Sequence, residues 1–375
     1  MRKIKETLKK VGNVLNKYVT RTLWIFLLLA ALSFAVLLIM KSSTETADFF
    51  NNTTGRAIRL VLTSIFNVFP FSFTETLVLL SPALIVLIFG IMIAKGKRGL
   101  EYATRFFCAL LSVVITIFSA FVFGYEASYY GSSIEENIGF ERNDVSVDEL
   151  KAAALILLER AEAELDNVEY IESGNSVLPY RFSELSDKVN EAYAKFCKEY
   201  PCYQSMHSRL KPVILSEPWT YTHISGLYSF FTGEANINVN YPDFIIVSTA
   251  AHEMSHQRGM GKEEECDFAS FLVCTMSDDP YIRYCGYLEN YRMLADKLYG
   301  ADREAWRELR SHEDDRITGE LSAFSSFFEK YRENVAATVN DAVNNAYIKS
   351  HNQPAGIKSY GLVADLVVNY VLYGD

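Results

Sequence analysis

Hydrophobic residues are distributed unevenly along the chain, and the change comes near residue 124. The first part contains three long, nearly uninterrupted apolar runs, at residues 23–40, 76–94 and 106–124. Each run is about long enough to cross the hydrocarbon core of a bilayer as a helix. A cleaved signal peptide has a shorter apolar core and a small-residue cleavage site, and here two further runs follow the first. The pattern predicts a membrane region with three transmembrane helices over residues 23–124.

Two segments beside these runs are amphipathic. Residues 1–22 carry seven Lys and Arg, with apolar residues at helical spacing, which predicts a basic amphipathic segment on anionic cytoplasmic lipid. An ordinary solvated leader is the alternative. Residues 57–73 are apolar but are interrupted by Arg59, Asn67 and Pro70, so we expect an interfacial helix and turn. A fourth span there would move the rest of the chain to the other side of the membrane.

The positive charges predict the orientation. The basic residues before the first run, and the cluster Lys95, Lys97 and Arg98 after the second, favour the cytoplasm. Three spans are compatible with both and place residues 125–375 outside the cytoplasm. We therefore expect a multi-pass membrane protein with an extracytoplasmic domain.

The charge balance separates the same two parts. Residues 1–124 contain 14 Lys and Arg against 5 Asp and Glu, whereas residues 125–375 carry a net charge of −19 within a total of −10. An acidic domain argues against a nucleic-acid partner and against direct adhesion to anionic lipid. The six cysteines form no CxxC pair. They predict mostly buried thiols, although Cys197 and Cys202 could close a small loop in an oxidising compartment.

Beyond residue 124 the periodicity is mainly helical. Amphipathic helices are expected over residues 147–164, 182–199, 281–299, 302–311, 316–347 and 360–373. Residues 235–240 alternate apolar and polar positions, which predicts a strand. The expected domain is thus mostly α, of the α+β class, with a small sheet.

The candidate chemistry lies in the stretch His252-Glu253-Met254-Ser255-His256, an HExxH pattern. On a helix, His252 and His256 lie one turn apart on the same face, so both imidazoles can reach one Zn²⁺ ion, and Glu253 lies beside them. The alternative is a polar helix that binds no metal. The helix is bordered by the apolar residues 245–247, and a buried His-Glu-His cluster without a metal would need other partners.

A catalytic zinc usually takes three protein ligands. Gly259 and Gly261 can end the first helix, and a second helix is expected from Lys262 to Cys274. Glu263, Glu264 and Glu265 therefore compete for the third position, unless they are only a solvated helix start favoured by the helix dipole.

The pair Glu263 and Asp267 resembles the gluzincin group, in which the ligand glutamate opens a second helix and an acidic residue one turn later orients a ligand histidine. The resemblance implies that Glu263 is the third ligand, with Glu264 as the alternative ligand, and that Asp267 holds one of the two histidines. The gap from His256 to Glu263 is shorter than in most gluzincins, so the Gly-Met-Gly turn must replace a longer insertion.

The whole chain resembles domain-of-unknown-function family 3810, bacterial membrane proteins with a zincin-like HExxH domain. The resemblance covers the membrane segments and five blocks, at residues 228–240, 251–274, 279–287, 343–347 and 356–361. It implies a membrane-bound, zincin-like protein and supplies no substrate.

Together these features predict a membrane-anchored zinc metallopeptidase that acts on a peptide or protein. Glu253 would be the general base toward water activated by zinc. In zincins an edge strand before the HExxH helix pairs with the substrate, and we assign that role to residues 235–239. An oxyanion needs a further donor, and the candidates are His223, Tyr228, Arg283, Tyr284 and Tyr360.

Two alternatives stay open. One is a catalytically silent zincin-like module for binding or sensing in the cell envelope. The other is a zinc hydrolase of envelope amides or esters. The sequence does not indicate an oligomeric state.

Overall fold

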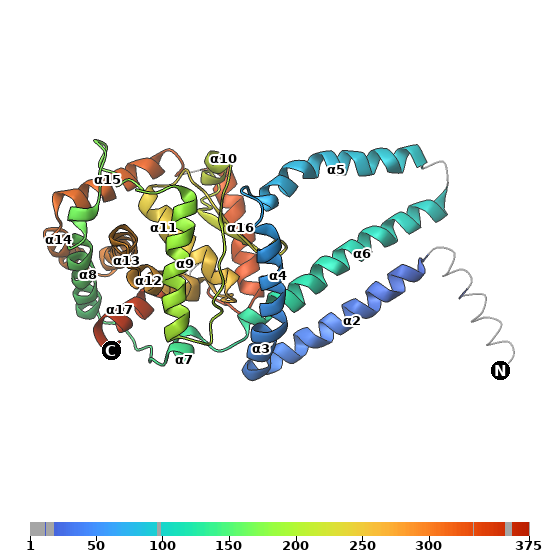
Figure 1. Ribbon diagram of the computed structural model, residues 1–375, viewed down its shortest axis with the longest axis horizontal. Helices are drawn as coiled ribbons and strands as arrows, with labels where there is room; N and C mark the ends of the chain where they lie inside the picture. Colours follow the sequence, from blue (N-terminus) through green and yellow to red (C-terminus); the bar gives the residue numbers. More distant parts are fainter. Residues whose placement is uncertain (1–11, 13–18, 96–98, 333, 357–361, 375) are drawn as a thin grey trace.

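The computed structural model describes residues 12, 19–95, 99–332, 334–356 and 362–374 (Figure 1). The predicted basic segment 1–22, the cluster residues Lys97 and Arg98, and Tyr360 lie wholly or largely outside these residues. The protein is mostly helical with one small sheet, as predicted.

Three apolar helices project together from one side of a globular part (Figure 1). They are α2 (Arg21–Ser42), α5 (Phe73–Lys95) and α6 (Leu100–Gly124), and each is long and apolar enough to cross a membrane. Each contains one of the three predicted runs. Helices α2 and α6 pack together, and a hydrogen bond of 2.9 Å joins the hydroxyls of Ser33 and Ser119. Small polar residues allow such close helix packing in lipid. The three helices are compatible with a membrane protein.

A short helical segment stands between the projecting helices and the globular part (Figure 1). It comprises α3 (Thr44–Phe50), the π-helical turn η1 (Asn51–Gly55) and α4 (Arg56–Phe66). Helix α4 buries Arg59 and Thr63 and exposes Leu60, Val61 and Ile65. With 11 residues it is much shorter than the roughly 20 needed for a span. A helix followed by a turn thus occupies residues 57–73, and its place at the membrane interface remains a prediction.

The globular part is built around two adjacent buried helices, α11 (Asp243–Gln257) and α12 (Glu263–Thr275). Helix α13 (Pro280–Ala301) packs against both, and α9 (Phe182–Glu199) also contacts both. Large side chains fill the space between these helices, including Tyr193, Phe244, Phe268, Phe271 and Tyr291. The remaining elements are η3 (Glu126–Tyr129), α7 (Ile134–Ile138), α8 (Val147–Glu162), η4 (Leu165–Asn167), α10 (Ser216–Thr220), α14 (Arg303–Arg310), α15 (Asp315–Glu329), α16 (Val335–Ser350) and α17 (Val363–Tyr373).

The sheet corrects one prediction. Its strands are β1 (Leu210–Pro212), β2 (Gly226–Ser229) and β3 (Glu234–Ile237), in the order β1-β3-β2. Strand β3 is parallel to β1 and antiparallel to β2. The strand predicted to offer a free edge is therefore the central one, and that prediction is wrong. The reason is β1, which is too short and irregular in sequence to show a strand periodicity yet covers the second edge of β3.

The predicted helix over residues 316–347 is also wrong, because it is two helices. Helix α15 ends at Glu329 and α16 starts at Val335. The Asn334 side chain caps the second helix by accepting a hydrogen bond of 2.8 Å from the amide of Ala337. Asparagine is among the preferred residues at this position, so a local capping signal interrupts a continuous apolar periodicity.

Polar contacts fasten the short helical segment to the end of α11. The Asn51 amide donates a hydrogen bond of 2.8 Å to the carbonyl of Gly259. The Arg59 guanidinium, itself 2% exposed, donates to the side chain and backbone of Asn51 and to the carbonyl of Gly124. Burial lowers the pKa of Arg59. Buried carbonyl groups are thus paired where the short helical segment and the end of α6 meet the turn after α11.

Gly259 allows this junction to close. Its φ is +94°, and a Cβ atom there would lie 2.4 Å from Nη2 of Arg59. We expect Gly259→Ala to destabilise the protein by about 1–3 kcal/mol, because the backbone is left-handed and the added methyl displaces the guanidinium. Thermal unfolding of the detergent-solubilised protein measures this loss. Gly300→Ala is the control, since no atom lies within 4 Å of the position of its Cβ, and an equal loss in both variants would contradict the prediction.

Candidate metal centre

Helix α11 carries the HExxH residues. Pro242 precedes it and Asp243 stands in its first turn, where a carboxylate is favoured by the helix dipole. The helix ends at Gln257, before the left-handed Gly259. The chain then turns and α12 begins at Glu263. The short Gly-Met-Gly turn thus places the start of α12 beside the last turns of α11.

The two histidines point the same ring nitrogen at one carboxylate. Oε2 of Glu263 lies 3.2 Å from Nε2 of His252 and 3.6 Å from Nε2 of His256. The two imidazole rings are 5.0 Å apart between centroids. Of the three glutamates weighed for the third position, the structure brings Glu263 to the histidines. No described contact joins Glu264 to either of them.

The other nitrogen of each ring is held by a separate partner. Nδ1 of His252 lies 2.6 Å from Oδ1 of Asp267. Nδ1 of His256 lies 2.9 Å from the carbonyl of Met260 and 2.8 Å from the hydroxyl of Tyr125. A carboxylate and a carbonyl only accept hydrogen bonds here, so they favour the proton on Nδ1 in both rings. Both Nε2 lone pairs are then free for a metal, which is the arrangement that such outer partners produce around zinc.

Cys266 offers a competing ligand. The donor atoms of His252, His256 and Cys266 all lie within 4.8 Å of one another, so this group could hold a metal ion. However, the Cys266 sulfur lies 3.2 Å from Nδ1 of His256, on the side of the ring away from Glu263. Burial, followed by the charge of Glu263, raises the pKa of the thiol well above its usual value. A thiol is a poor metal ligand until it loses its proton, and this favours Glu263 over Cys266.

Glu253 lies beside the histidines and has an unused acceptor. It is 5% exposed, and its Oε2 has no hydrogen-bond partner among the described residues. Burial raises its pKa to about 6, against the opposing effect of the two histidines. Gly226 of β2 makes room for it, because a Cβ there would lie 2.5 Å from Oε1 of Glu253. A water molecule or a ligand would satisfy the free oxygen.

The charges in the centre depend on one another. Burial would lower the pKa of His252, but Asp267 and Glu263 raise it well above its usual value. Burial would also lower the pKa of His256, but Glu263 raises it. The reverse holds for Glu263, where burial would raise the pKa but the two histidines lower it. The pocket therefore favours an anionic Glu263 together with positive charge on or between the imidazoles.

Three of the four predicted oxyanion donors that the structure describes have partners away from the candidate metal centre. Nε2 of His223 lies 2.9 Å from the carbonyl of Tyr331. Arg283 pairs with Glu164, and Tyr284 donates to Glu320. Tyr360 lies outside the described residues. Among the four candidates that the structure describes, only Tyr228 is in the centre. Its ring stacks on His256 with 6.1 Å between centroids, and its hydroxyl is buried without a partner among the described residues.

Tyr125 is a site residue that sequence reasoning missed. It directly follows the last residue of α6, and it reaches His256 across 131 positions of the chain. It also packs against Tyr228 and Tyr129. The one signal in the sequence is a tyrosine-rich stretch, residues 125–130, at the end of the third apolar run. Nothing there indicates a partner in the HExxH helix.

Tyr125→Phe tests the role of this hydroxyl. We expect the affinity for Zn²⁺ to fall by about 10-fold or more, because outer partners that orient a ligand imidazole typically contribute 10- to 100-fold. A zinc titration with a competing chelator measures the affinity in purified protein. Tyr373→Phe is the matched control, since its hydroxyl bonds Glu149 and Tyr373 is 61% exposed. Unchanged affinity in Tyr125→Phe would exclude an orienting role.

Comparison with known proteins identifies the family. No curated protein and no solved structure matches the chain. One family model, described as a protein of unknown function (DUF3810), matches residues 50–368. The match starts in α3 and includes α5, α6, the metal centre and most of α17. The chain belongs to the DUF3810 family, as the sequence blocks predicted.

Proposed function

We propose that the protein is a membrane-anchored zinc metallopeptidase that hydrolyses peptide bonds. One observation carries the proposal: two imidazole nitrogens and the Glu263 carboxylate converge on one point, and the unpartnered oxygen of Glu253 lies beside them. The donor set suits zinc, since two histidines and a glutamate are a known catalytic combination. Bound there, zinc would polarise a scissile carbonyl and make water a nucleophile at neutral pH.

The residues of the chain would divide the remaining work. Glu253 would accept the proton of the attacking water at Oε2 and return it to the leaving amine. Asp267, the Met260 carbonyl and Tyr125 would keep both histidines in the ligand tautomer. Tyr228 is retained as the oxyanion donor, because among the predicted donors that the structure describes it alone contacts a candidate ligand.

We place this chemistry close to the membrane surface, outside the cytoplasm of a bacterial cell. Tyr125 follows the end of α6 without a gap and touches His256 directly. A substrate bond would then be cut within a few side-chain lengths of the bilayer. Peptide segments near the membrane are therefore the proposed substrates, and the bilayer is the proposed environment.

One observation favours the alternative of a silent binding or sensing module. Glu253 and His256 are 5% and 7% exposed, so this conformation admits little water to the centre. Peptidase activity would require the site to open for substrate. A module that only binds a metal would not.

Elemental analysis of the detergent-purified protein tests the ligand set. We expect about one zinc per chain in the wild type and a loss of zinc in His252→Ala and Glu263→Ala. Glu264→Ala is the matched control, because it removes a neighbouring carboxylate that does not contact the histidines. Cys266→Ala should also keep zinc, and its loss there would assign the third position to the thiol. A folded wild type that binds no zinc would refute the proposal.

Glu253→Gln separates peptidase from binding module. We expect this variant to keep zinc while peptide cleavage falls by about 10²- to 10⁴-fold, the usual contribution of a general base. Cleavage is followed with a peptide library and mass spectrometry in reconstituted membranes. If the wild type holds zinc but cleaves no peptide beyond those that Glu253→Gln also cleaves, the protein is a binding module.

A further inference from the structure

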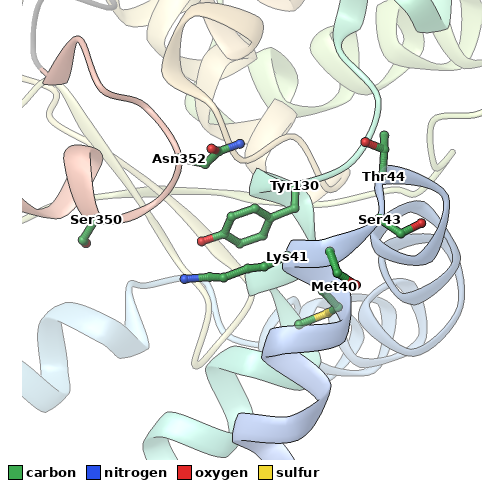
Figure 2. A pocket seen from close by; sticks show the side chains of 8 residues that line it. Met40, Lys41, Ser43, Thr44, Tyr130, Ser350 and Asn352 are labelled. Carbon is green, nitrogen blue, oxygen red and sulfur yellow. The ribbon is translucent and has the colours of Figure 1, made fainter.

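A polar hollow lies where the first apolar helix meets the globular part (Figure 2). Its volume is about 460 Å³. Three separate parts of the chain line it: the end of α2 with the start of α3, the residue after η3, and the end of α16 with the turn that follows. The lining residues are Met40, Lys41, Ser42, Ser43, Thr44, Tyr130, Ser350 and Asn352.

Lys41 supplies the charge of this hollow. Its amine lies 5.2 Å from the centre of the Tyr130 ring, which holds the ammonium through a cation–π contact. Figure 2 shows the Lys41 side chain extended beneath that ring. No lining residue is acidic, and no carboxylate of the described residues forms an ion pair with the amine. The hollow therefore carries a positive charge that the chain does not neutralise.

One carboxylate that contacts a lining residue, that of Glu126, has other partners. Glu126 is 4% exposed and lies 3.4 Å from Nε2 of His351, and it accepts a hydrogen bond of 3.3 Å from the Tyr130 hydroxyl. Burial would lower the pKa of His351, but the contact with Glu126 raises it. The charge of Glu126 is thus directed at His351, which leaves the Lys41 amine available.

Figure 2 shows Asn352 and Ser350 on the side of the Tyr130 ring toward which the Lys41 amine points, and Ser43 and Thr44 on the other side. Asn352 adopts a left-handed φ of +62° and donates a hydrogen bond of 3.2 Å to the carbonyl of Tyr129. That bond fixes the Asn352 amide at the rim on the side of the amine. Ammonium and amide donors together match the oxygens of a phosphate group.

We propose that this hollow binds the phosphate of an anionic phospholipid headgroup. The hollow opens at the end of α2, a helix long and apolar enough to cross the membrane. The ends of such helices lie at the depth of the lipid phosphates, where lysine side chains reach out of the hydrocarbon. A lysine at the end of a membrane-spanning helix often has no role beyond reaching out of the hydrocarbon. Here, residues about 90 and 310 positions further along the chain complete a walled site around it.

Lipid retention by the full-length protein tests the proposal. The protein is reconstituted in nanodiscs that contain equal parts of phosphatidylglycerol and phosphatidylcholine, and the retained lipid is measured by native mass spectrometry after extraction into mild detergent. We expect selective retention of phosphatidylglycerol, reduced about tenfold or more in Lys41→Gln because a charge-assisted contact is lost. Lys41→Arg should restore it. Unchanged zinc content and thermal stability would show that Lys41→Gln is folded.

Lys349→Gln is the matched control. It removes the same charge from an exposed residue next to Ser350, and it does not line the hollow. Equal losses in both variants, or equal retention of the two lipids by the wild type, would overturn the proposal and leave only general attraction to an anionic bilayer. A further arm adds millimolar inorganic phosphate. If phosphate without the lipid protects the wild type from thermal unfolding as well as phosphatidylglycerol does, the lipid assignment is refuted. The proposal does not depend on peptidase activity.

Discussion

The buried polar junction between the short helical segment, the end of α6 and the turn after α11 is the constraint on which the candidate metal centre depends. Asn51 precedes α5 in the chain and Tyr125 follows α6, and their side chains donate hydrogen bonds to the carbonyls of Gly259 and Met260. Those two carbonyls belong to the turn between His256 and Glu263. Because buried carbonyls must be paired, the fold holds this turn only when Asn51 and Tyr125 are in place. The geometry of the candidate ligands is therefore set in part by residues outside the globular part.

The features that could be predicted from the sequence are those that depend on residues close together in the chain. The placement of His252 and His256 on one helical face follows from a spacing of four residues, and α9 occupies its predicted range because its apolar residues recur at helical intervals. The glycine turn and the helix start leave Glu263, Glu264 and Glu265 open, and the resemblance to gluzincins selects Glu263. The spacing of the two histidines and the periodicity of α9 are local relations. Strand β1 leaves no periodic trace, and the contacts of Asn51 with Gly259 and of Tyr125 with His256 join residues more than 100 positions apart. The mistaken edge strand is a failure of this second kind.

The electrostatics of the centre indicate what kind of ligand it needs. Three carboxylates, those of Glu253, Glu263 and Asp267, face two imidazoles in a largely buried space. If the imidazoles are neutral, the cluster has an uncompensated negative charge, which is costly in a medium of low dielectric. Protons on the histidines offer one remedy, and a divalent cation between the Nε2 atoms offers another. The cation also uses the lone pairs that the Nδ1 partners leave free, whereas a proton would give each ring two donors. The pairing of Nδ1 with Asp267 and with the Met260 carbonyl thus favours the cation.

The extent of the family match agrees with a candidate centre to which both the apolar helices and the globular part contribute. The match starts at residue 50, one position before Asn51, and continues to residue 368. It therefore includes the junction, two of the three apolar helices and both candidate metal-binding helices as one unit. A peptidase that was only tethered to the membrane could exchange its anchor without changing its site. Here the residue that follows an apolar helix touches a candidate ligand histidine, so a change at that helix end is also a change at the metal centre. The end of α6 is thus part of the framework of the candidate site.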